Sequence, residues 1–334
     1  MSANAPILTV EQVSKSFPMR RSFFSRATEV LHAVVDVSLE IAAGETLGIV
    51  GESGCGKTTL ARLIVRLHTP DRGRILFRER DLASMPAAEL RSTRTRLQMV
   101  FQDPYSSLNP RMAVGDAIAE PLHVHRIVPP AEVERERDLL MERVGLSRRL
   151  ASRLPRELSG GQRQRVSIAR ALSVRPEVLI ADEAVSSLDV SVRAQILNLL
   201  ADLRAELGLT LIFISHDLSV VDHLSDRVAV MYLGRVVELG PTADVLGAGG
   251  HPYTRGLVAA IPQPVVGHRR SQPAIRGELP SSVRPPSGCV FRTRCPISQS
   301  ICAEVLPANL AVGPMHWAAC HFATVGVTPA MAEV

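Results

Sequence analysis

The sequence predicts an α/β fold built around a largely parallel sheet. Two observations support this: apolar strands alternate with amphipathic helices along the chain, and a glycine-rich phosphate-binding pattern joins one strand to the next helix. The length of 334 residues corresponds to about two typical domains. Charged residues make up 21% and hydrophobic residues 46% of the chain, which is the balance of a folded protein.

The first predicted strands precede the glycine-rich pattern. Residues 7–13, 34–41 and 45–50 are rich in apolar and β-branched side chains, and the last of these runs ends at Gly51. Residues 59–67 predict the helix that follows. The order strand, glycine-rich loop, helix is the first α/β unit of the chain.

A helical insertion is predicted over about residues 103–175. This block begins with a loop rich in proline, serine and asparagine and continues with helical periodicity. Buried-strand patterns return at residues 178–181 and 209–215. The amphipathic helix between them stops at Gly208, a typical C-terminal cap.

The C-terminal part of the chain changes character. Residues 228–239 predict a hairpin, whereas beyond Pro262 prolines become frequent and long periodic segments cease. We therefore expect two regions, residues 1–261 and a small, irregular, cysteine-containing region at residues 262–334.

The glycine-rich pattern occupies residues 51–58, with the sequence GESGCGKT, and fits G-x-x-x-x-G-K-[ST]. Its glycines let the backbone wrap around phosphate oxygens, and the N–H groups at the helix start attract the anion. Lys57 would neutralise the β- and γ-phosphates of a nucleotide, and the Thr58 hydroxyl would ligate Mg²⁺. A plain glycine-rich turn is the alternative, and the strand and helix on either side argue against it.

Two carboxylates follow the strand at residues 178–181. Asp182 and Glu183 would lie at the carboxyl edge of the sheet, where α/β proteins bind ligands. Asp182 is suited to hold Mg²⁺, and Glu183 is suited to orient and deprotonate an attacking water.

A second candidate anion site lies at residues 158–162, with the sequence LSGGQ, directly before a predicted helix. Here the sequence closely resembles the ATP-binding cassette (ABC) family. In that family this segment faces the γ-phosphate held by a partner subunit, so that two cassettes enclose two ATP molecules. The resemblance implies the P-loop NTPase cassette fold: a mostly parallel core sheet, an antiparallel β subdomain and a helical insertion.

The resemblance also implies roles for individual residues. Glu183, His216 and Gln102 would be catalytic, and Mg²⁺ would contact Thr58, Gln102 and Asp182. Phe17 would stack on adenine, although a place in the strand core is the alternative for this ring. The nucleotide-contacting set is Phe17, Gly51, Ser53, Gly54, Cys55, Gly56, Lys57, Thr58, Thr59, Gln102, Ser159, Gly160, Gly161, Gln162, Asp182 and Asp189.

Four of the five cysteines lie near the C-terminus with the spacing C-x5-C-x6-C-x17-C: Cys289, Cys295, Cys302 and Cys320. In a reducing compartment, clustered cysteines suggest metal ligands before disulfides. Structural zinc sites usually contain close C-x2-4-C pairs, which this spacing lacks. An iron–sulfur cluster, zinc and free thiols therefore remain open.

The segments HPYT (residues 251–254), GELPS (277–281) and PPSGCVF (285–291) resemble the C-terminal region of the dipeptide/oligopeptide importer ATPases. That resemblance favours a [4Fe-4S] cluster on the four cysteines, with Zn²⁺ as the alternative. It also implies an ATPase subunit that powers import of di- and oligopeptides. The expected partners are two transmembrane permeases, a second and non-identical ABC ATPase, and an extracytoplasmic peptide-binding protein.

Composition limits the location and the alternatives. No apolar run approaches the ~18 residues that cross a bilayer, and the N-terminus lacks signal-peptide features, so we expect the chain to stay in the cytoplasm. The resemblance implies a peripheral subunit on the cytoplasmic face of the inner membrane. Aromatic residues are only 4% of the chain and the net charge is +5, which predicts no nucleic-acid partner. The alternatives are an importer for nickel or another small solute and, in another class, a soluble ABC ATPase acting on nucleic acid.

Overall fold

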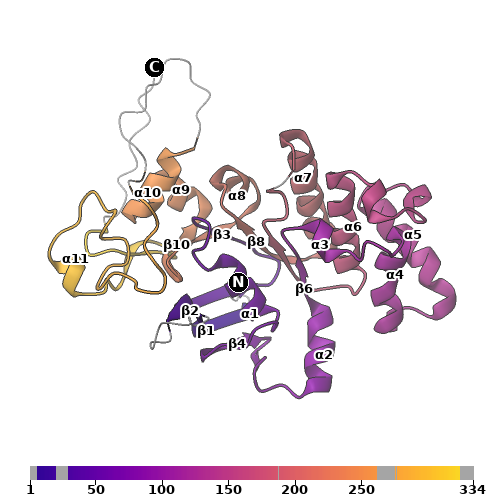
Figure 1. Cartoon of the computed structure of the whole chain (residues 1–334), viewed down its shortest axis with the longest axis horizontal. Coiled ribbons are helices and arrows are strands. Elements are labelled where there is room, and N and C mark those ends of the chain that lie inside the picture. The colour runs from indigo at the N-terminus through magenta and orange to yellow at the C-terminus, as the bar shows by residue number, and fades with distance from the viewer. Residues whose placement is uncertain (1–5, 20–28, 187, 262–274, 276, 324–334) are drawn as a thin grey trace, which may run out of the picture.

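The computed structural model describes residues 6–19, 29–186, 188–261, 275 and 277–323. Two β-sheets form the body of the molecule (Figure 1). The smaller sheet is antiparallel, with the strand order β2-β1-β4-β5. Its strands are β1 (Pro6–Pro18), β2 (Val30–Ala42), β4 (Arg72–Phe77) and β5 (Arg80–Asp81).

The larger sheet has eight strands in the order β11-β12-β10-β9-β3-β8-β7-β6. The strands from β9 to β6 are parallel, whereas β10, β12 and β11 continue the sheet antiparallel. The core sheet is therefore mixed, with its parallel half at the predicted strands. Its members are β3 (Thr46–Val50), β6 (Leu97–Val100), β7 (Val178–Asp182), β8 (Thr210–Ser215), β9 (Arg227–Tyr232), β10 (Arg235–Pro241), β11 (Asn309–Gly313) and β12 (His316–Ala319).

The central strands are covered on both faces. Every residue of β3, β7 and β8 is buried. Along β8, Leu211 and Phe213 face one apolar cluster, while Ile212 and Ile214 face the other. Covering on both faces explains why these strands have continuous apolar sequences, which made them predictable.

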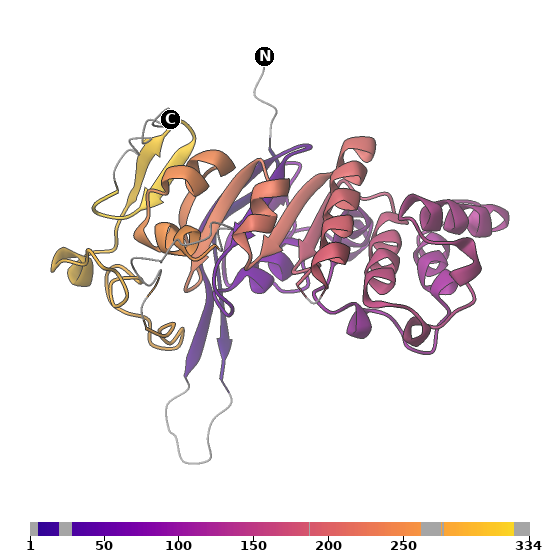
Figure 2. The same cartoon turned by 90° about the horizontal axis from the view of Figure 1, so that it is seen from above.

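Helices pack around this sheet, and the predicted helical insertion is present as one block. Figures 1 and 2 place this block at one end of the molecule and the C-terminal segment at the opposite end. The block comprises α3 (Pro104–Ser107), α4 (Val114–Val124), α5 (Val133–Arg143), three 3-10 turns and α6 (Gly160–Leu172). The other helices are α1 (Lys57–Ile64), α2 (Ala87–Arg96), α7 (Val190–Leu207), α8 (Leu218–Leu224), α9 (Thr242–Ala248), α10 (Pro252–Ala259) and α11 (Ile301–Glu304).

Two features of the fold differ from the sequence prediction. Strands β1 and β2 are each 13 residues long and pair as far as Pro18 and Val30, so they form a ribbon that extends from the body (Figure 2). The C-terminal region is also less irregular than expected, because β12 pairs with β10 and adds two strands to the core sheet. Both strands are short and β11 is largely exposed, so neither gives an apolar sequence pattern long enough to predict a strand.

Candidate functional site

The phosphate-binding loop connects β3 to α1, as predicted. Gly51 and Gly56 have φ angles of +154° and +106°. A Cβ atom at Gly51 would lie 2.2 Å from the Met231 carbonyl oxygen, and one at Gly56 would lie 2.1 Å from the Ala33 carbonyl oxygen. Only glycine fits these two positions, because the loop lies against the backbone of β2 and β9.

Lys57 is buried inside the curve of this loop. Its ammonium donates hydrogen bonds to the carbonyl oxygens of Gly51 (2.7 Å) and Glu52 (3.1 Å). The thiol of Cys55 is buried beside it, and burial raises the pKa of that thiol. Ser53 and Gly54 are exposed, and Thr59 is half-buried in the first turn of α1. The loop thus presents a positive charge and an open rim, which suits a phosphate chain.

Two of the three predicted Mg²⁺ ligands, Thr58 and Asp182, are in contact, whereas the third, Gln102, donates to Glu183. The Thr58 hydroxyl donates to Asp182 Oδ1 at 3.1 Å, which joins the phosphate loop to the end of β7. Asp182 is 1% exposed. Burial raises the pKa of its carboxyl, and the hydrogen bond from Thr58 opposes that rise. A hydroxyl and a carboxylate side by side are oxygen ligands that fit Mg²⁺.

Glu183, Gln102 and His216 converge from the ends of three strands. Gln102 Nε2 donates to Glu183 Oε2 at 2.9 Å, and His216 Nδ1 lies 3.4 Å from the same oxygen. The Glu183 side chain is 12% exposed, and its backbone has a φ of +46°, an uncommon conformation for a residue with a side chain. Gln102 and His216 therefore both lie against the Glu183 carboxylate, so the three predicted catalytic residues form one cluster.

The LSGGQ segment starts α6 in the helical insertion. The Ser159 hydroxyl accepts the Gln162 N–H at 3.3 Å, and the Gln162 side chain accepts the Ser159 N–H at 3.0 Å, which is a capping box. Ser159 and Gly160 are exposed, whereas Gly161 is buried against α7. Within the described residues, no hydrogen bond joins this segment to the phosphate loop.

The remaining predicted residues are placed as follows. Asp189 is the exposed residue before α7. The Phe17 ring lies on β1, half-buried and edge-on to His68 with a centroid separation of 5.4 Å. The Lys15 ammonium lies 5.5 Å from its centroid. This position allows the ring to be reached from outside, so a stacking role remains a prediction.

The four C-terminal cysteines do not support the predicted metal site. In the part of the chain that the structure describes, no group of three or more His, Cys, Asp or Glu side chains is placed to hold a metal ion. Burial raises the pKa of Cys289 to about 11, and the other three cysteines add to that rise. The Cys289 N–H donates to the Cys302 carbonyl oxygen at 2.8 Å. Cys320 Sγ nevertheless accepts a hydrogen bond from its own loop, from the Phe322 N–H at 3.4 Å. The predicted [4Fe-4S] cluster and its zinc alternative therefore lack structural support.

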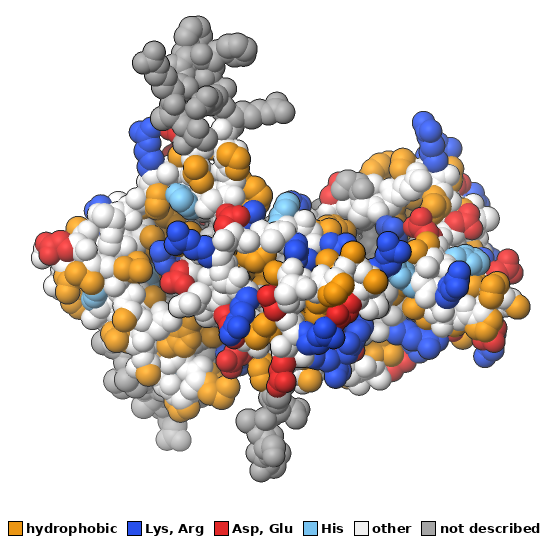
Figure 3. All heavy atoms as spheres, turned by 90° about the horizontal axis from the view of Figure 1, so that it is seen from below, with side chains coloured by type: hydrophobic (Ala, Val, Ile, Leu, Met, Phe, Trp, Pro, Cys, Tyr) orange, Lys and Arg blue, Asp and Glu red, His pale blue; other side chains and the backbone are white. Residues whose placement is uncertain are grey.

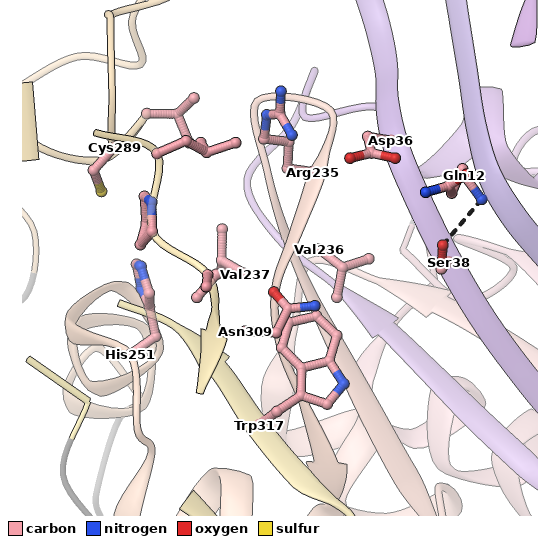
Figure 4. A pocket seen from close by; sticks show the side chains of 15 residues that line it. Gln12, Asp36, Ser38, Arg235, Val236, Val237, His251, Cys289, Asn309 and Trp317 are labelled. Atoms are coloured by element: carbon pink, nitrogen blue, oxygen red, sulfur yellow. Dashed lines mark hydrogen bonds between the residues drawn. The ribbon is translucent and has the colours of Figure 1, made fainter. Parts of the chain in front are cut away.

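A separate cavity of about 400 Å³ lies between β2, β10 and the C-terminal strands (Figure 4). Arg235 and Asp36 line one part of it, and Cys289, His251 and Trp317 line others. None of the predicted nucleotide residues lines this cavity. Nucleotide binding is therefore expected at the phosphate loop and not here.

Comparison with known proteins gives two family matches. Residues 34–186 match the model described as "ABC transporter", and residues 237–302 match the one described as "Oligopeptide/dipeptide transporter, C-terminal region".

Curated relatives match over almost the whole chain. A probable peptide ABC transporter ATP-binding protein of Sinorhizobium fredii is 50% identical, over 94% of this chain and 89% of its own length. Oligopeptide transport ATP-binding proteins of Bacillus subtilis and Haemophilus influenzae are each 48% identical, over 94% of this chain and 97% and 96% of their lengths.

Solved structures match the cassette. A dimeric ATP-binding cassette in a post-hydrolysis state, bound to ADP and Pi, aligns with a TM-score of 0.63 and 28% identity, covering 70% of this chain and 98% of its own. A component of an ABC transporter complex of Clostridium perfringens aligns with a TM-score of 0.61 and 31% identity, covering 72% of this chain and 91% of its own.

Proposed function

This chain belongs to the ABC transporter ATP-binding proteins of the oligopeptide/dipeptide type, and from that premise we propose how its residues bind and hydrolyse ATP to power peptide import. The relatives named above are peptide transport proteins, so they disfavour the nickel and nucleic-acid alternatives. The observation that carries the catalytic proposal is the convergence of Gln102, Glu183 and His216 beside the Thr58–Asp182 contact.

Each residue has a separate part in hydrolysis. Lys57 and the backbone N–H groups of the loop hold the β- and γ-phosphates. Thr58 and Asp182 would hold Mg²⁺, and that ion would supply positive charge for the phosphate oxygens. Glu183 accepts the proton of the attacking water, while Gln102 and His216 fix the position of that carboxylate. The test is phosphate release by the assembled transporter with and without its peptide-loaded binding protein.

The second part of the proposal is a two-cassette arrangement in which Ser159, Gly160, Gly161, Gln162 and Asp189 face nucleotide held by a partner ATPase. The exposure of Ser159 and Gly160 supports it, as does the dimeric state named for the similar cassette. A capped helix start is also a suitable anion site. Cross-linking between a cysteine at residue 159 and one in the partner's phosphate loop tests it, since a failure under ATP would contradict the arrangement.

A cleft of about 260 Å³ supports docking of a permease on the helical insertion. Its lining comes from β6, α3, α4 and α6. Phe101 lines the cleft and is 38% exposed; Tyr105 of α3 and Val124 of α4 lie outside the lining and are 53% and 68% exposed. An apolar helix end of a permease would bury these side chains. Replacing Val124 with Asp should reduce co-purification of the permeases without changing ATP binding to the isolated subunit.

The proposed location is peripheral, on the cytoplasmic face of the membrane. No described helix is long and apolar enough to cross a bilayer. Charged side chains of both signs are interspersed with apolar ones on the face shown in Figure 3. Two permeases, a non-identical second ATPase and an extracytoplasmic peptide-binding protein are the proposed partners, and co-purification of the complex tests their number.

The division of the chain at residue 262 is also a proposal. Residues 262–274 lie outside the described residues, and the C-terminal family match begins earlier, at residue 237. The proposed function assigns no role to a [4Fe-4S] cluster, because the described cysteines form no metal-binding group. Iron and zinc analysis of anaerobically purified protein tests this, because about four iron atoms per chain would support the cluster assignment.

A further inference from the structure

The C-terminal region makes a direct contact with the phosphate loop. Arg294 Nη1 donates to both carboxylate oxygens of Glu52, at 2.9 and 3.0 Å, across 242 positions of sequence. Glu52 is the second residue of the loop. The Arg294 side chain is 7% exposed and the Glu52 side chain 26%, so this is a partly buried ion pair. Such ion pairs fix the relative position of the two side chains, and loss of one partner leaves the other charge without a counter-ion.

Glu52 is held at three points. Its N–H donates to the Tyr253 hydroxyl at 2.9 Å, its carbonyl oxygen accepts from Lys57 at 3.1 Å, and its carboxylate binds Arg294. Tyr253 and Arg294 both lie within residues 237–302, the part that matches the C-terminal family. The carbonyl also accepts the Cys55 N–H at 3.2 Å, within the loop, so the N–H and the carboxylate are the two groups of Glu52 that are held from outside the nucleotide-binding segment.

Arg294 is itself positioned by a buried aromatic cluster. Phe291 lies three residues before it, with ring centroids 5.2 Å from Tyr232, 5.4 Å from Tyr253 and 5.6 Å from His251. Phe291, Tyr232 and Tyr253 are at most 2% exposed. The Tyr232 hydroxyl also accepts from Arg294 Nη1 at 3.4 Å. The guanidinium thus reaches the loop from a rigid support.

We propose that Arg294 is a positioning residue for ATP binding: through Glu52 it holds the phosphate loop open for the β- and γ-phosphates, and so couples the C-terminal region to the ATP site. The inference rests on the proposed ATP-binding role of this loop. Without Arg294, the Glu52 carboxylate would be an unpaired negative charge on the loop that receives an anionic ligand. Repulsion between this carboxylate and the phosphates would then weaken ATP binding, and so would the shifted position of the loop.

The test is a double-mutant cycle on the purified full-length subunit, with equilibrium binding of Mg²⁺-ATP as the readout. Arg294→Gln should weaken binding by about tenfold, within the range of typical coupling between sites. Glu52→Gln should have a smaller effect, because the charge that it leaves without a counter-ion, the Arg294 guanidinium, is positive and does not oppose an anionic ligand. The double variant should bind ATP more tightly than Arg294→Gln alone, because the unpaired carboxylate is gone. Arg294→Lys, which restores the charge without the paired geometry, should recover part of the affinity.

Controls separate this proposal from the function on which it rests. Arg284→Gln removes an arginine from the same region at a side chain that is 82% exposed, and should leave ATP affinity unchanged. Lys57→Ala should abolish tight binding; if it does not, the phosphate-loop assignment itself fails. If Lys57→Ala weakens binding but Arg294→Gln does not, or if the Arg294 and Glu52 effects simply multiply, the positioning role is overturned. If Arg294→Gln does not fold, Arg294→Lys is measured in both the wild-type and the Glu52→Gln backgrounds. A loss of affinity in the first background and none in the second supports the coupling, and equal losses in both, or no loss in either, contradict it.

Discussion

Glu183→Gln separates proton transfer from nucleotide binding. The substitution preserves the shape of the side chain and leaves an oxygen that can still accept the hydrogen bond from Gln102, now 2.9 Å long. The side chain is 12% exposed, so the amide remains enclosed. The substitution removes the proton acceptor. General-base catalysis contributes at least ~100-fold to a reaction rate, which corresponds to about 2.7 kcal/mol of the activation free energy. ATP affinity should remain near that of the wild type.

The assay is steady-state phosphate release by the assembled transporter, together with equilibrium ATP binding to the subunit. Glu177→Gln is a matched control, since Glu177 precedes the other end of β7 and pairs with Arg78 at the surface. It should hydrolyse ATP at the wild-type rate. Turnover of Glu183→Gln near that of the wild type would refute the base assignment, and loss of ATP binding would show that the carboxylate supports the loop instead.

Further predictions concern the other parts of the molecule. Lys57→Ala should weaken ATP binding itself, measured by titration, because the counter-charge to the phosphates is lost. Ser159→Tyr should leave ATP binding to the isolated subunit unchanged but reduce hydrolysis by the complex; an equal loss in both would contradict a site shared between cassettes. For Glu238, burial favours a higher pKa, but hydrogen bonds from His316 and two backbone N–H groups outweigh it and lower the pKa. This carboxylate therefore stabilises the fold above its unfolded pKa of about 4.5, and that contribution is lost as pH falls through the lower folded value. In acid denaturation, Glu238→Gln should reduce the dependence of stability on pH below about 4.5, and an unchanged profile would refute this. Cys302→Ser should leave ATP binding intact. Elemental analysis should compare the metal content of this variant with that of the wild type.

The sequence was sufficient for the parts of the fold that are buried on both faces. Strands β3, β7 and β8 are continuous apolar runs, and a predicted site residue follows each of them. Because parallel strands bring their carboxyl ends to one edge, Lys57 and Asp182 could be assigned to one site from the sequence, and the family resemblance added His216. The contact of Gln102 with Glu183 agrees with that expectation.

Long-range contacts without a periodic pattern were not predictable. The pairing of β12 with β10 involves short strands, and the Glu52–Arg294 ion pair joins two residues far apart in sequence. No spacing rule connects an acidic loop residue to an arginine in a proline-rich region. The cysteine prediction went further than the structure allows, because spacing shows only that thiols can meet, not that they meet in ligand geometry.

Strand β12 covers the edge of β10 in the core sheet. An uncovered β10 would present unpaired N–H and C=O groups, a template on which strands from other molecules can add. In this chain β12 takes that place, pairing at Glu238 and Leu239 and leaving the short strand β11 outermost. A chain shortened before β12 would therefore expose this template on β10 even where its phosphate loop is intact.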